Sequence, residues 1–361
     1  MKMRQNFELL LPKKIIFGAG SVKKVGDEAK NLGGKNAVIV VSRGMRKREG
    51  FKELTESLNR QEIGSKTVCE VEPEPKIEEI YNCIKTAEAE VEEAEAEVEE
   101  EVEADGGNLV IGLGGGSVLD VAKKVAADLG WKKIMIPTTA GTGSEVTHEA
   151  VLKVEGRKRA FVDELLTPDI AIVDPDLMKT MPPRLVASSG IDALAHSIEC
   201  YDSKRSNFLV KTLASDAYKI LKENLRKAVE GDEETEKEGK AKEEAMEKMA
   251  LGSLMAGMAF GNSGTALAHA LSYPLSNEGI PHGEAVAMVL PYALEFNGFD
   301  ASVIKEVKRI IKDLRIGRAI KTEIAEMAEV VMQDEKHLSN NPREVRFKDV
   351  VQIYENLKNE N

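Results

Sequence analysis

The stretch NLVIGLGGGSVLDVAKKVAADLG, residues 108–130, joins a short apolar run to an amphipathic run through three consecutive glycines. The first run predicts a strand over 108–114, and the spacing of apolar residues in the second predicts a helix over 117–130. Glycines let a backbone approach a phosphate closely, and a helix N-terminus attracts anions. We therefore expect the turn and its helix to bind a cofactor through these residues: Gly114, Gly115, Gly116, Ser117 and Asp120. A tight turn without a ligand is the alternative, and in either case Ser117 is placed to cap the helix.

Other short apolar runs, bounded by glycine, proline or asparagine, alternate with helical patterns in the first half of the chain. They predict strands over 14–20, 36–42, 133–139 and 170–174. Such alternation indicates a parallel sheet covered by helices on both faces. After MPPRL, residues 181–185, only helical periodicity is left, and the two prolines suggest a domain boundary. We therefore expect an α/β domain over 1–183 and an all-helical domain over 184–361.

The bulk composition excludes several classes of function. The chain has 361 residues and a net charge of −12, which disfavours nucleic acid as a partner. No apolar run reaches the roughly 18 residues that span a bilayer, and the apolar run near the start is too short for a signal peptide. The cysteines Cys69, Cys83 and Cys200 are odd in number and fit no metal or redox spacing. We therefore expect reduced cysteines and a cytoplasmic protein without a membrane partner.

A seven-residue duplication, AEAEVEE, occupies residues 87–93 and again 94–100. Apolar residues fall near one helical stripe in both copies and just beyond them: Ala87, Val91, Ala94, Val98 and Val102. Glutamate fills most of the other positions, and runs of like charge usually face solvent. The pattern predicts a lengthened helix that is solvated on most sides, and an acidic arm that binds a partner is the alternative.

A second loop rich in small donors follows the strand predicted over 133–139. Its sequence is IPTTAGTGSEVT, residues 136–147. Two such loops at the carboxyl ends of neighbouring parallel strands suit a nucleotide in the crevice of the sheet. We expect its hydroxyl groups to contact the cofactor: Thr138, Thr139, Thr142 and Ser144.

The third candidate site begins in GIDALAHSIECY, residues 190–201, where Asp192 and His196 lie four residues apart. Residues at this spacing share one face of a helix, so both side chains can reach one metal ion. A satisfied aspartate–histidine hydrogen bond is the alternative for this pair alone. His269 in an apolar helical run and His282 after a proline add two further ligands. One aspartate and three histidines suit a divalent transition metal, either Fe²⁺ or Zn²⁺.

The motifs around these residues resemble the signatures of the iron-containing (group III) alcohol dehydrogenases. The matching blocks are GGGSVLDVAK, PTTAGTGSEVT, ASSGIDALAHSIECY and PHGEAVAMVLPY, and the resemblance runs nearly end to end. It implies that the α/β domain over 1–183 is a Rossmann-like dinucleotide-binding domain. It implies that Fe²⁺, or Zn²⁺ as the usual substitute, is held in the cleft between the two domains by Asp192, His196, His269 and His282. It also implies an NAD(P)-linked exchange between small alcohols and aldehydes or ketones, in a homodimer or larger homo-oligomer.

The sequence departs from this family at two positions. Many members carry a second histidine four residues after the third ligand, where this chain has Tyr273. A tyrosine either relays a proton or only lines the cleft, and we regard Tyr273 and His269 as the candidate catalytic residues. In NAD-preferring members an aspartate often ends the second strand, where this chain has Ser42 and Arg43. Because serine and arginine can bind a 2′-phosphate, we predict NADP(H) over NAD(H), with plain surface charge as the alternative.

The substrate pocket is predicted from position alone. Phe260 and the pair His148 and Glu149 are expected to face the substrate, and His148 could equally be an exposed loop residue. Enzymes of the same fold offer alternative functions, such as a hydroxyacid–oxoacid transhydrogenase, a maleylacetate-type reductase, a polyol dehydrogenase or a dehydroquinate synthase-like lyase. A catalytically silent metal- or nucleotide-binding protein is the alternative from another class.

Overall fold

Six parallel strands form one sheet, in the order β1-β8-β5-β4-β2-β3. The structure is a computed structural model, and it describes residues 6–72, 75–96, 107–230, 236–317 and 320–360. The strands are β1 (Lys14–Phe17), β2 (Asn36–Val41), β3 (Gly64–Glu70), β4 (Asn108–Gly114), β5 (Lys132–Pro137) and β8 (Ile170–Val173). All but β3 lie where the sequence predicts strands. The pattern does not predict β3, because the run GSKTVCE at the edge of the sheet is half exposed and lacks a continuous apolar core face.

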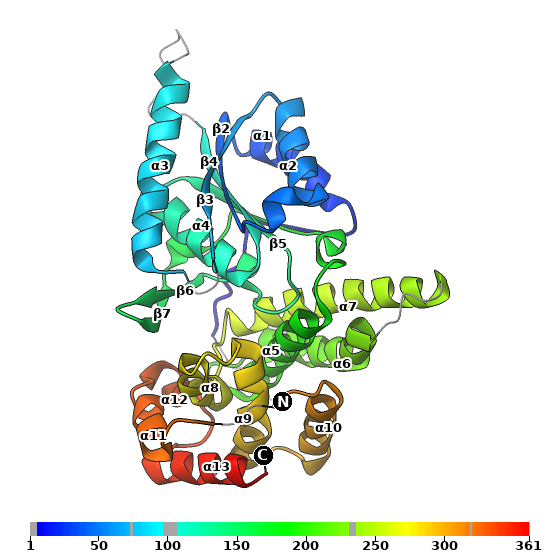
Figure 1. Cartoon of the computed structure of the whole chain (residues 1–361), viewed down its shortest axis with the longest axis vertical. Coiled ribbons are helices and arrows are strands. Elements are labelled where there is room, and N and C mark those ends of the chain that lie inside the picture. The colour runs from blue at the N-terminus through cyan, green and yellow to red at the C-terminus, as the bar shows by residue number, and fades with distance from the viewer. Residues whose placement is uncertain (1–5, 73–74, 97–106, 231–235, 318–319, 361) are drawn as a thin grey trace. The chain divides into compact units, whose positions relative to one another are not determined.

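Helices cover both faces of this sheet (Figure 1). They are α1 (Val25–Asn31), α2 (Glu49–Arg60), α3 (Ile77–Ala96) and α4 (Gly116–Leu129). Alternate residues of β2 belong to two separate cores, since Ile39 packs with Leu54 of α2 while Val40 packs with Ile80 of α3 and Val121 of α4. This arrangement confirms the α/β class of the first half of the chain.

A hairpin outside the main sheet was not predicted. It comprises β6 (Glu149–Val154) and β7 (Arg157–Val162), which pair antiparallel. Its two-residue turn places Glu155 and Gly156 at φ values of 50° and 81°, as short hairpin turns require. Five short 3₁₀ helices complete the connections within the described ranges: Ser21–Lys24, Met45–Lys47, Ser144–Val146, Glu164–Leu166 and Pro175–Met178.

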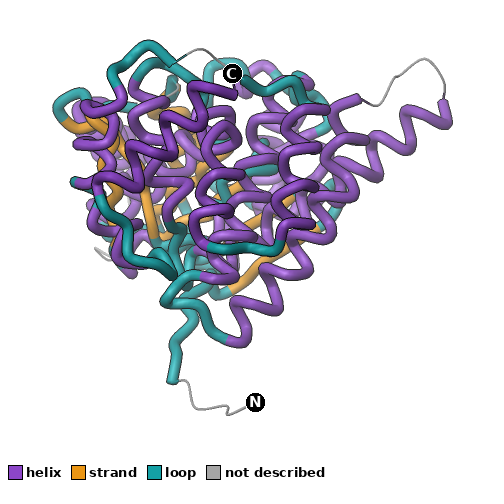
Figure 2. Tube along the Cα trace, turned by 90° about the horizontal axis from the view of Figure 1, so that it is seen from below, coloured by secondary structure: helices purple, strands orange, loops and turns teal. Residues whose placement is uncertain are grey.

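From Met181 onward the described residues form helices and their connections, which Figure 2 colours purple and teal. The helices are α5 (Pro183–Asp202), α6 (Phe208–Glu230), α7 (Glu236–Phe260), α8 (Leu267–Asn277), α9 (His282–Asn297), α10 (Ala301–Asp313), α11 (Ile324–Met332), α12 (Glu335–Asn340) and α13 (Phe347–Glu360). This confirms the all-α class of the second half. No described helix is long and apolar enough to cross a bilayer, and a cytoplasmic location stays a prediction.

Contacts between Cα atoms divide the chain into two units, an α/β unit and a helical unit. The helical unit begins at Met181 and also includes residues 6–9 and Ala140–Thr142. A single cut after residue 183 misses these two segments, because contacts distant in sequence cannot be deduced from composition.

The prediction that all cysteines are reduced is wrong for two of them. Cys69 of β3 and Cys83 of α3 form a disulfide, while Cys200 is free and buried. The pairing follows from the packing of α3 beside β3, and no sequence motif marks it. The cysteines therefore no longer support a reducing compartment.

The first copy of the duplication lies in α3. Ala87 and Val91 are buried in the core between α3 and the sheet, while Glu88 and Glu92 are exposed. The predicted stripe is therefore correct for Ala87 and Val91. The side chain of Ala94 and all of residues 97–106 lie outside what the structure describes.

Candidate active site

One face of α5 carries the first two candidate ligands. The helix starts at Pro183, where proline costs no hydrogen bond, and most of its side chains are buried. Asp192 and His196 are 3% and 5% exposed, so a carboxylate and an imidazole lie in the interior one helical turn apart. Burial of a charged carboxylate is costly unless a cation or several donors compensate it.

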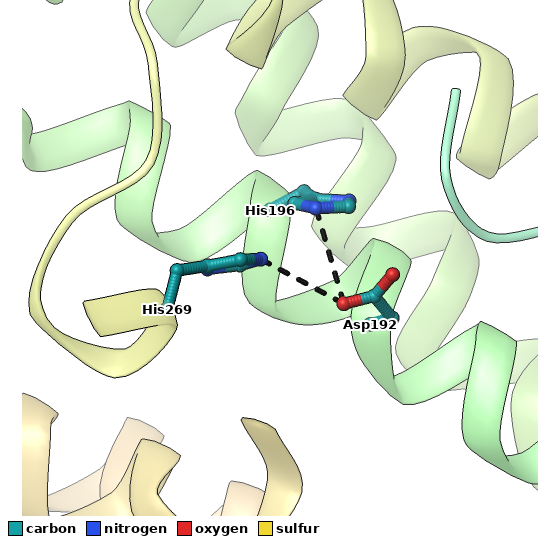
Figure 3. A group of neighbouring side chains, drawn as sticks. All are labelled: Asp192, His196 and His269. Atoms are coloured by element: carbon teal, nitrogen blue, oxygen red, sulfur yellow. Dashed lines mark ion pairs between the residues drawn. The ribbon is translucent and has the colours of Figure 1, made fainter. Parts of the chain in front are cut away.

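The four predicted ligands converge on one oxygen atom. The Nε2 atoms of His196, His269 and His282 lie 3.9, 3.7 and 3.6 Å from Asp192 Oδ1. Figure 3 shows Asp192, His196 and His269 pointing toward one another. These three residues meet the distance requirements of a metal site. The structure thus brings together side chains from α5, α8 and α9.

The chemistry of this cluster fits a divalent metal ion. Within the described ranges, the buried atoms Asp192 Oδ1 and His269 Nε2 make no hydrogen bond. Ligands about 2.1 Å from a tetrahedral ion lie about 3.4 Å from one another, close to the separations found here. An ion bound by these atoms would satisfy polar groups that are otherwise costly to bury.

Glu199 holds His269 in place, and the sequence analysis did not identify it. One carboxylate oxygen contacts His269 Nδ1, and the other accepts a hydrogen bond from Ala268 N at 2.6 Å. A partner at Nδ1 leaves Nε2 for the metal, as is usual for ligating histidines. The signal was present, because residues 192, 196 and 199 follow an i, i+4, i+7 pattern that shares one face of α5.

The pKa values of the cluster reflect burial and mutual charge. Burial lowers the pKa of His196 to about 4, so its imidazole is neutral at pH 7. Burial alone would also lower the pKa of His269, but Glu199 and Asp192 outweigh it and raise the pKa to about 10. Burial would raise the pKa of Asp192, yet His196 and His282 hold it below its usual range. A metal ion would replace the proton on His269, so binding should release protons.

Aromatic rings surround the cluster. Phe260 stacks on His196 with centroids 4.1 Å apart, so this predicted pocket residue lies directly against a candidate ligand. The ring of Tyr273 stacks on that of His282 with centroids 6.3 Å apart, and it lies edge-on to the ring of His337 with centroids 5.6 Å apart. His337, to which the sequence analysis gave no role, is buried and its Nδ1 lies 2.7 Å from a carboxylate oxygen of Asp334. Tyr273 is thereby held between two imidazoles.

The glycine turn lies between β4 and α4, as predicted, but the capping prediction is wrong. Helix α4 begins at Gly116, its N-cap is Gly115, and no side chain makes a capping hydrogen bond. Ser117 therefore lies inside the first turn rather than before it. The first N–H groups of a helix have no partner within that helix, so the turn is suited to bind a phosphate.

The hydroxyl-rich loop lies beside the glycine turn because β5 pairs with β4. Thr138 N donates to Gly114 O at 2.9 Å, and a Cβ atom added to Gly115 would lie 3.4 Å from the Thr139 side chain. Thr139 thus lies against the glycine turn. Thr142 falls in the segment grouped with the helical unit.

Asp120 and Ser144 bind each other rather than facing solvent. Ser144 Oγ donates to Asp120 Oδ1 at 2.5 Å, and Val151 N donates to Oδ2 at 3.0 Å. The fully buried Lys123, not identified from the sequence, donates to Ser144 O at 3.0 Å and lies 3.4 Å from Asp120 Oδ1. These groups join α4 to the hydroxyl loop and give Asp120 a supporting position.

The arginines that follow β2, Arg43 and Arg46, form ion pairs with acidic residues at and just after the end of β3. Arg43 lies 3.4 Å from Glu70 and 3.8 Å from Glu72, and Arg46 lies 2.7 Å from Glu70. Ser42 O accepts a hydrogen bond from Met45 N at 2.9 Å. A 2′-phosphate at this position would compete with Glu70 for both arginines.

The remaining pocket residues, His148 and Glu149, lie in the α/β unit at the start of β6. His148 O accepts from Asp163 N at 3.1 Å, and the backbone carbonyl of Glu149 accepts from Lys123. Both side chains are half-buried. The Glu149 carbonyl thus joins the start of the hairpin to Lys123 of α4.

Comparison with known families places the chain. Residues 12–175 match the iron-containing alcohol dehydrogenase family, and residues 186–319 match the C-terminal region of the Fe-containing alcohol dehydrogenases. The chain belongs to the iron-containing alcohol dehydrogenase family. Membership makes it an oxidoreductase of the alcohol dehydrogenase type and implies a metal and a nicotinamide dinucleotide as cofactors.

Individual relatives of this family differ in cofactor and substrate. The chain is 34% identical over 313 residues to an NADPH-dependent butanol dehydrogenase of Clostridium saccharobutylicum, with 80% of this chain and 73% of the relative aligned. It is 32% identical over 308 residues to an NAD-dependent methanol dehydrogenase of Bacillus methanolicus, covering 80% and 75%. The crystal structure of a 1,3-propanediol oxidoreductase superposes with a TM-score of 0.87 and 26% identity, covering 98% of this chain and all of the other. The butanol dehydrogenase uses NADPH and the methanol dehydrogenase uses NAD, so these two relatives disagree on the cofactor.

Proposed function

We propose that this protein is a metal-dependent alcohol dehydrogenase that also reduces aldehydes or ketones, with NADP(H) as the preferred cofactor. The observation that supports this most strongly is the convergence of three histidine Nε2 atoms on Asp192 Oδ1. When bound by these four side chains, Fe²⁺ or Zn²⁺ supplies a Lewis acid that favours an alkoxide over an alcohol and polarises a carbonyl group.

The protein's own contribution is charge, orientation and exclusion of water. Asp192 supplies the negative charge of the ligand set, and Glu199 fixes the imidazole of His269. Phe260, stacked on His196, shields that imidazole from solvent on one side. Because these groups are positioned before substrate arrives, no reorganisation is required during the reaction.

The α/β unit binds the dinucleotide in this proposal. The glycine turn at 114–116 holds the phosphates through backbone N–H groups, and Thr138 and Thr139 lie beside it. The nicotinamide supplies the acceptor or donor of a hydride, and the protein supplies its orientation. Asp120 and Ser144 hold the hydroxyl-rich loop in position against α4, because they form a hydrogen bond with each other.

Tyr273 takes the place of the second histidine in this proposal. Its ring is held between His282 and His337, and its hydroxyl donates a hydrogen bond to the substrate oxygen. Replacing Tyr273 by Phe should change the pH–rate profile while leaving metal content intact. An unchanged profile would mean that Tyr273 only lines the pocket.

The preference for NADP(H) rests on Ser42, Arg43 and Arg46. The arginines are more than half exposed and held by Glu70, so they are already oriented toward one point. A 2′-phosphate carries more charge than one carboxylate and can displace Glu70 from them. A higher kcat/KM with NADH than with NADPH would contradict this preference.

The experiment that tests the function is an anaerobic assay. Protein loaded with Fe²⁺ is mixed with NADPH or NADH and a panel of aldehydes, ketones and 2-oxoacids, and oxidation of the nicotinamide is followed by absorbance. We expect consumption with at least one carbonyl class and its loss in His269→Ala. No consumption by protein with bound metal and nucleotide would instead indicate a transhydrogenase or a lyase of the same fold.

A further inference from the structure

A bidentate ion pair joins the two helices that carry three of the four proposed ligands. Arg184 in the first turn of α5 donates to Glu284 in the first turn of α9, through Nε at 2.7 Å and through its second amino group at 3.1 Å. Helix α5 carries Asp192 and His196, and α9 begins at His282 itself. Glu284 lies two residues beyond His282, so the ion pair holds the end of α9 from which this ligand projects.

The backbones of the two helices touch beside this ion pair. A Cβ atom added to Gly283 would lie 1.9 Å from Ser188 O, which no side chain could tolerate. Only glycine therefore allows α9 to approach α5 this closely, one residue after His282. The close approach sets the distance between the helices. The ion pair adds a second contact between the same two helix ends.

The two partners of the ion pair differ in exposure. The side chain of Glu284 is 6% exposed, while that of Arg184 is 63% exposed. Arg184 borders a cavity of about 410 Å³ that is also lined by Ala187, Leu314 and Ile316. Removing the cation from an ion pair whose carboxylate is buried costs more free energy than removing the carboxylate from an exposed arginine.

We propose that the Arg184–Glu284 pair is the positioning contact that sets the metal affinity of the site by fixing His282 relative to α5. This inference rests on the proposed metal site. His282 is the most exposed of the four ligands, with a side chain 32% exposed against 5–7% for the others. It is therefore the ligand least restrained by surrounding packing and most dependent on an anchor near its own helix end.

The test measures the Kd of Co²⁺ for the whole apoprotein by competition with a chromophoric chelator, together with the visible absorption of bound Co²⁺. We expect Arg184→Gln and Glu284→Gln to weaken Co²⁺ binding by about ten- to a hundredfold, the usual effect of removing a residue that orients a ligand. Arg184→Lys keeps the charge but loses the bidentate geometry, so it should fall between wild type and Arg184→Gln. The absorption bands should shift in the weakened variants.

The matched control is Glu306→Gln, which removes another ion pair between helices of the same unit. Glu306 lies 3.2 Å from Lys222 and joins α10 to α6. The Glu306→Gln variant should bind Co²⁺ with a Kd within about twofold of the wild-type value, because this ion pair joins helices that carry no proposed ligand. A second control places Glu284→Gln in a His282→Ala background, where the pair should have no further effect on affinity because it acts through His282.

The outcomes separate the inference from the proposed function. Wild-type protein that binds no Co²⁺ would overturn the metal site and the inference with it. Wild-type protein that binds Co²⁺ as tightly as its Arg184 and Glu284 variants would overturn the inference alone. An effect of Glu284→Gln that persists without His282 would also overturn it. If Glu284→Gln does not fold, Arg184→Lys and Arg184→Gln decide the question.

Discussion

Glu199 is not one of the four proposed metal ligands, yet its carboxylate decides which nitrogen of His269 faces the other ligands. It accepts hydrogen bonds from both His269 and Ala268 and is buried. Such a residue belongs to the site even though it would not touch substrate.

Replacing Glu199 by Gln should weaken metal binding about ten- to a hundredfold, because a neutral amide stabilises the ligating form of His269 less well. Chelator competition with Zn²⁺ measures the change. Glu306→Gln, which removes a carboxylate outside the cluster, serves as the control. An affinity equal to that of wild type would show that Glu199 does not orient the ligand.

Glu145 gives a second prediction at this scale, because burial raises its pKa to about 7 from an ordinary value of 4.5. Between these values the folded protein holds a proton that the unfolded chain releases. The free energy of unfolding should therefore fall as pH rises from 4.5 to 7, by up to roughly 3 kcal/mol from this group.

Glu145→Gln removes this titration, so its stability relative to wild type should increase across the same range. Urea unfolding of both proteins at several pH values measures the difference. A difference that does not depend on pH would mean that Glu145 titrates normally in the folded state.

Several site residues could be predicted from sequence because their relation is local. Asp192 and His196 share a helical face, and the three glycines lie in one turn, so spacing alone places them. His337 could not be found this way, since its contact with Tyr273 joins segments 64 residues apart. Lys123 was missed for a similar reason, because its acceptors lie on a loop beyond β5.

At the scale of elements, continuous apolar runs predicted the strands of the sheet, whereas β3, β6 and β7 escaped. These three strands are half exposed, and their polar residues weaken the pattern that marks a buried strand. The omission mattered for function. Glu70 at the end of β3 pairs with Arg43 and Arg46, so the cofactor prediction was made without its main competitor.

Glu70→Gln should therefore increase the preference for NADPH over NADH, because both arginines lose a competing carboxylate. The arginines are exposed, so the gain should be modest, about two- to fivefold in the ratio of kcat/KM values. Glu72→Gln, which removes a more distant acid at 3.8 Å from Arg43, should have a smaller effect. A shift of the preference toward NADH would mean that the 2′-phosphate of NADP(H) does not bind beside Arg43 and Arg46.

At the scale of the whole molecule, the sequence predicted an α/β half and a helical half, and both classes are confirmed. The segments 6–9 and Ala140–Thr142, which group with the helical unit, could not be predicted because their contacts are distant in sequence. The proposed ligands come from three helices of that unit. A bound ion would therefore cross-link α5, α8 and α9 and stabilise the folded state by mass action.

The most direct test of the central claim is a reconstitution experiment on the whole protein. Metal is removed with a chelator, Fe²⁺ is returned anaerobically in steps, and metal per chain and carbonyl-dependent oxidation of NADPH are measured in the same samples. We predict activity that rises in proportion to bound Fe²⁺, saturates at one ion per chain and is absent from Asp192→Ala. Full activity in metal-free protein, or activity retained by Asp192→Ala, would contradict the account.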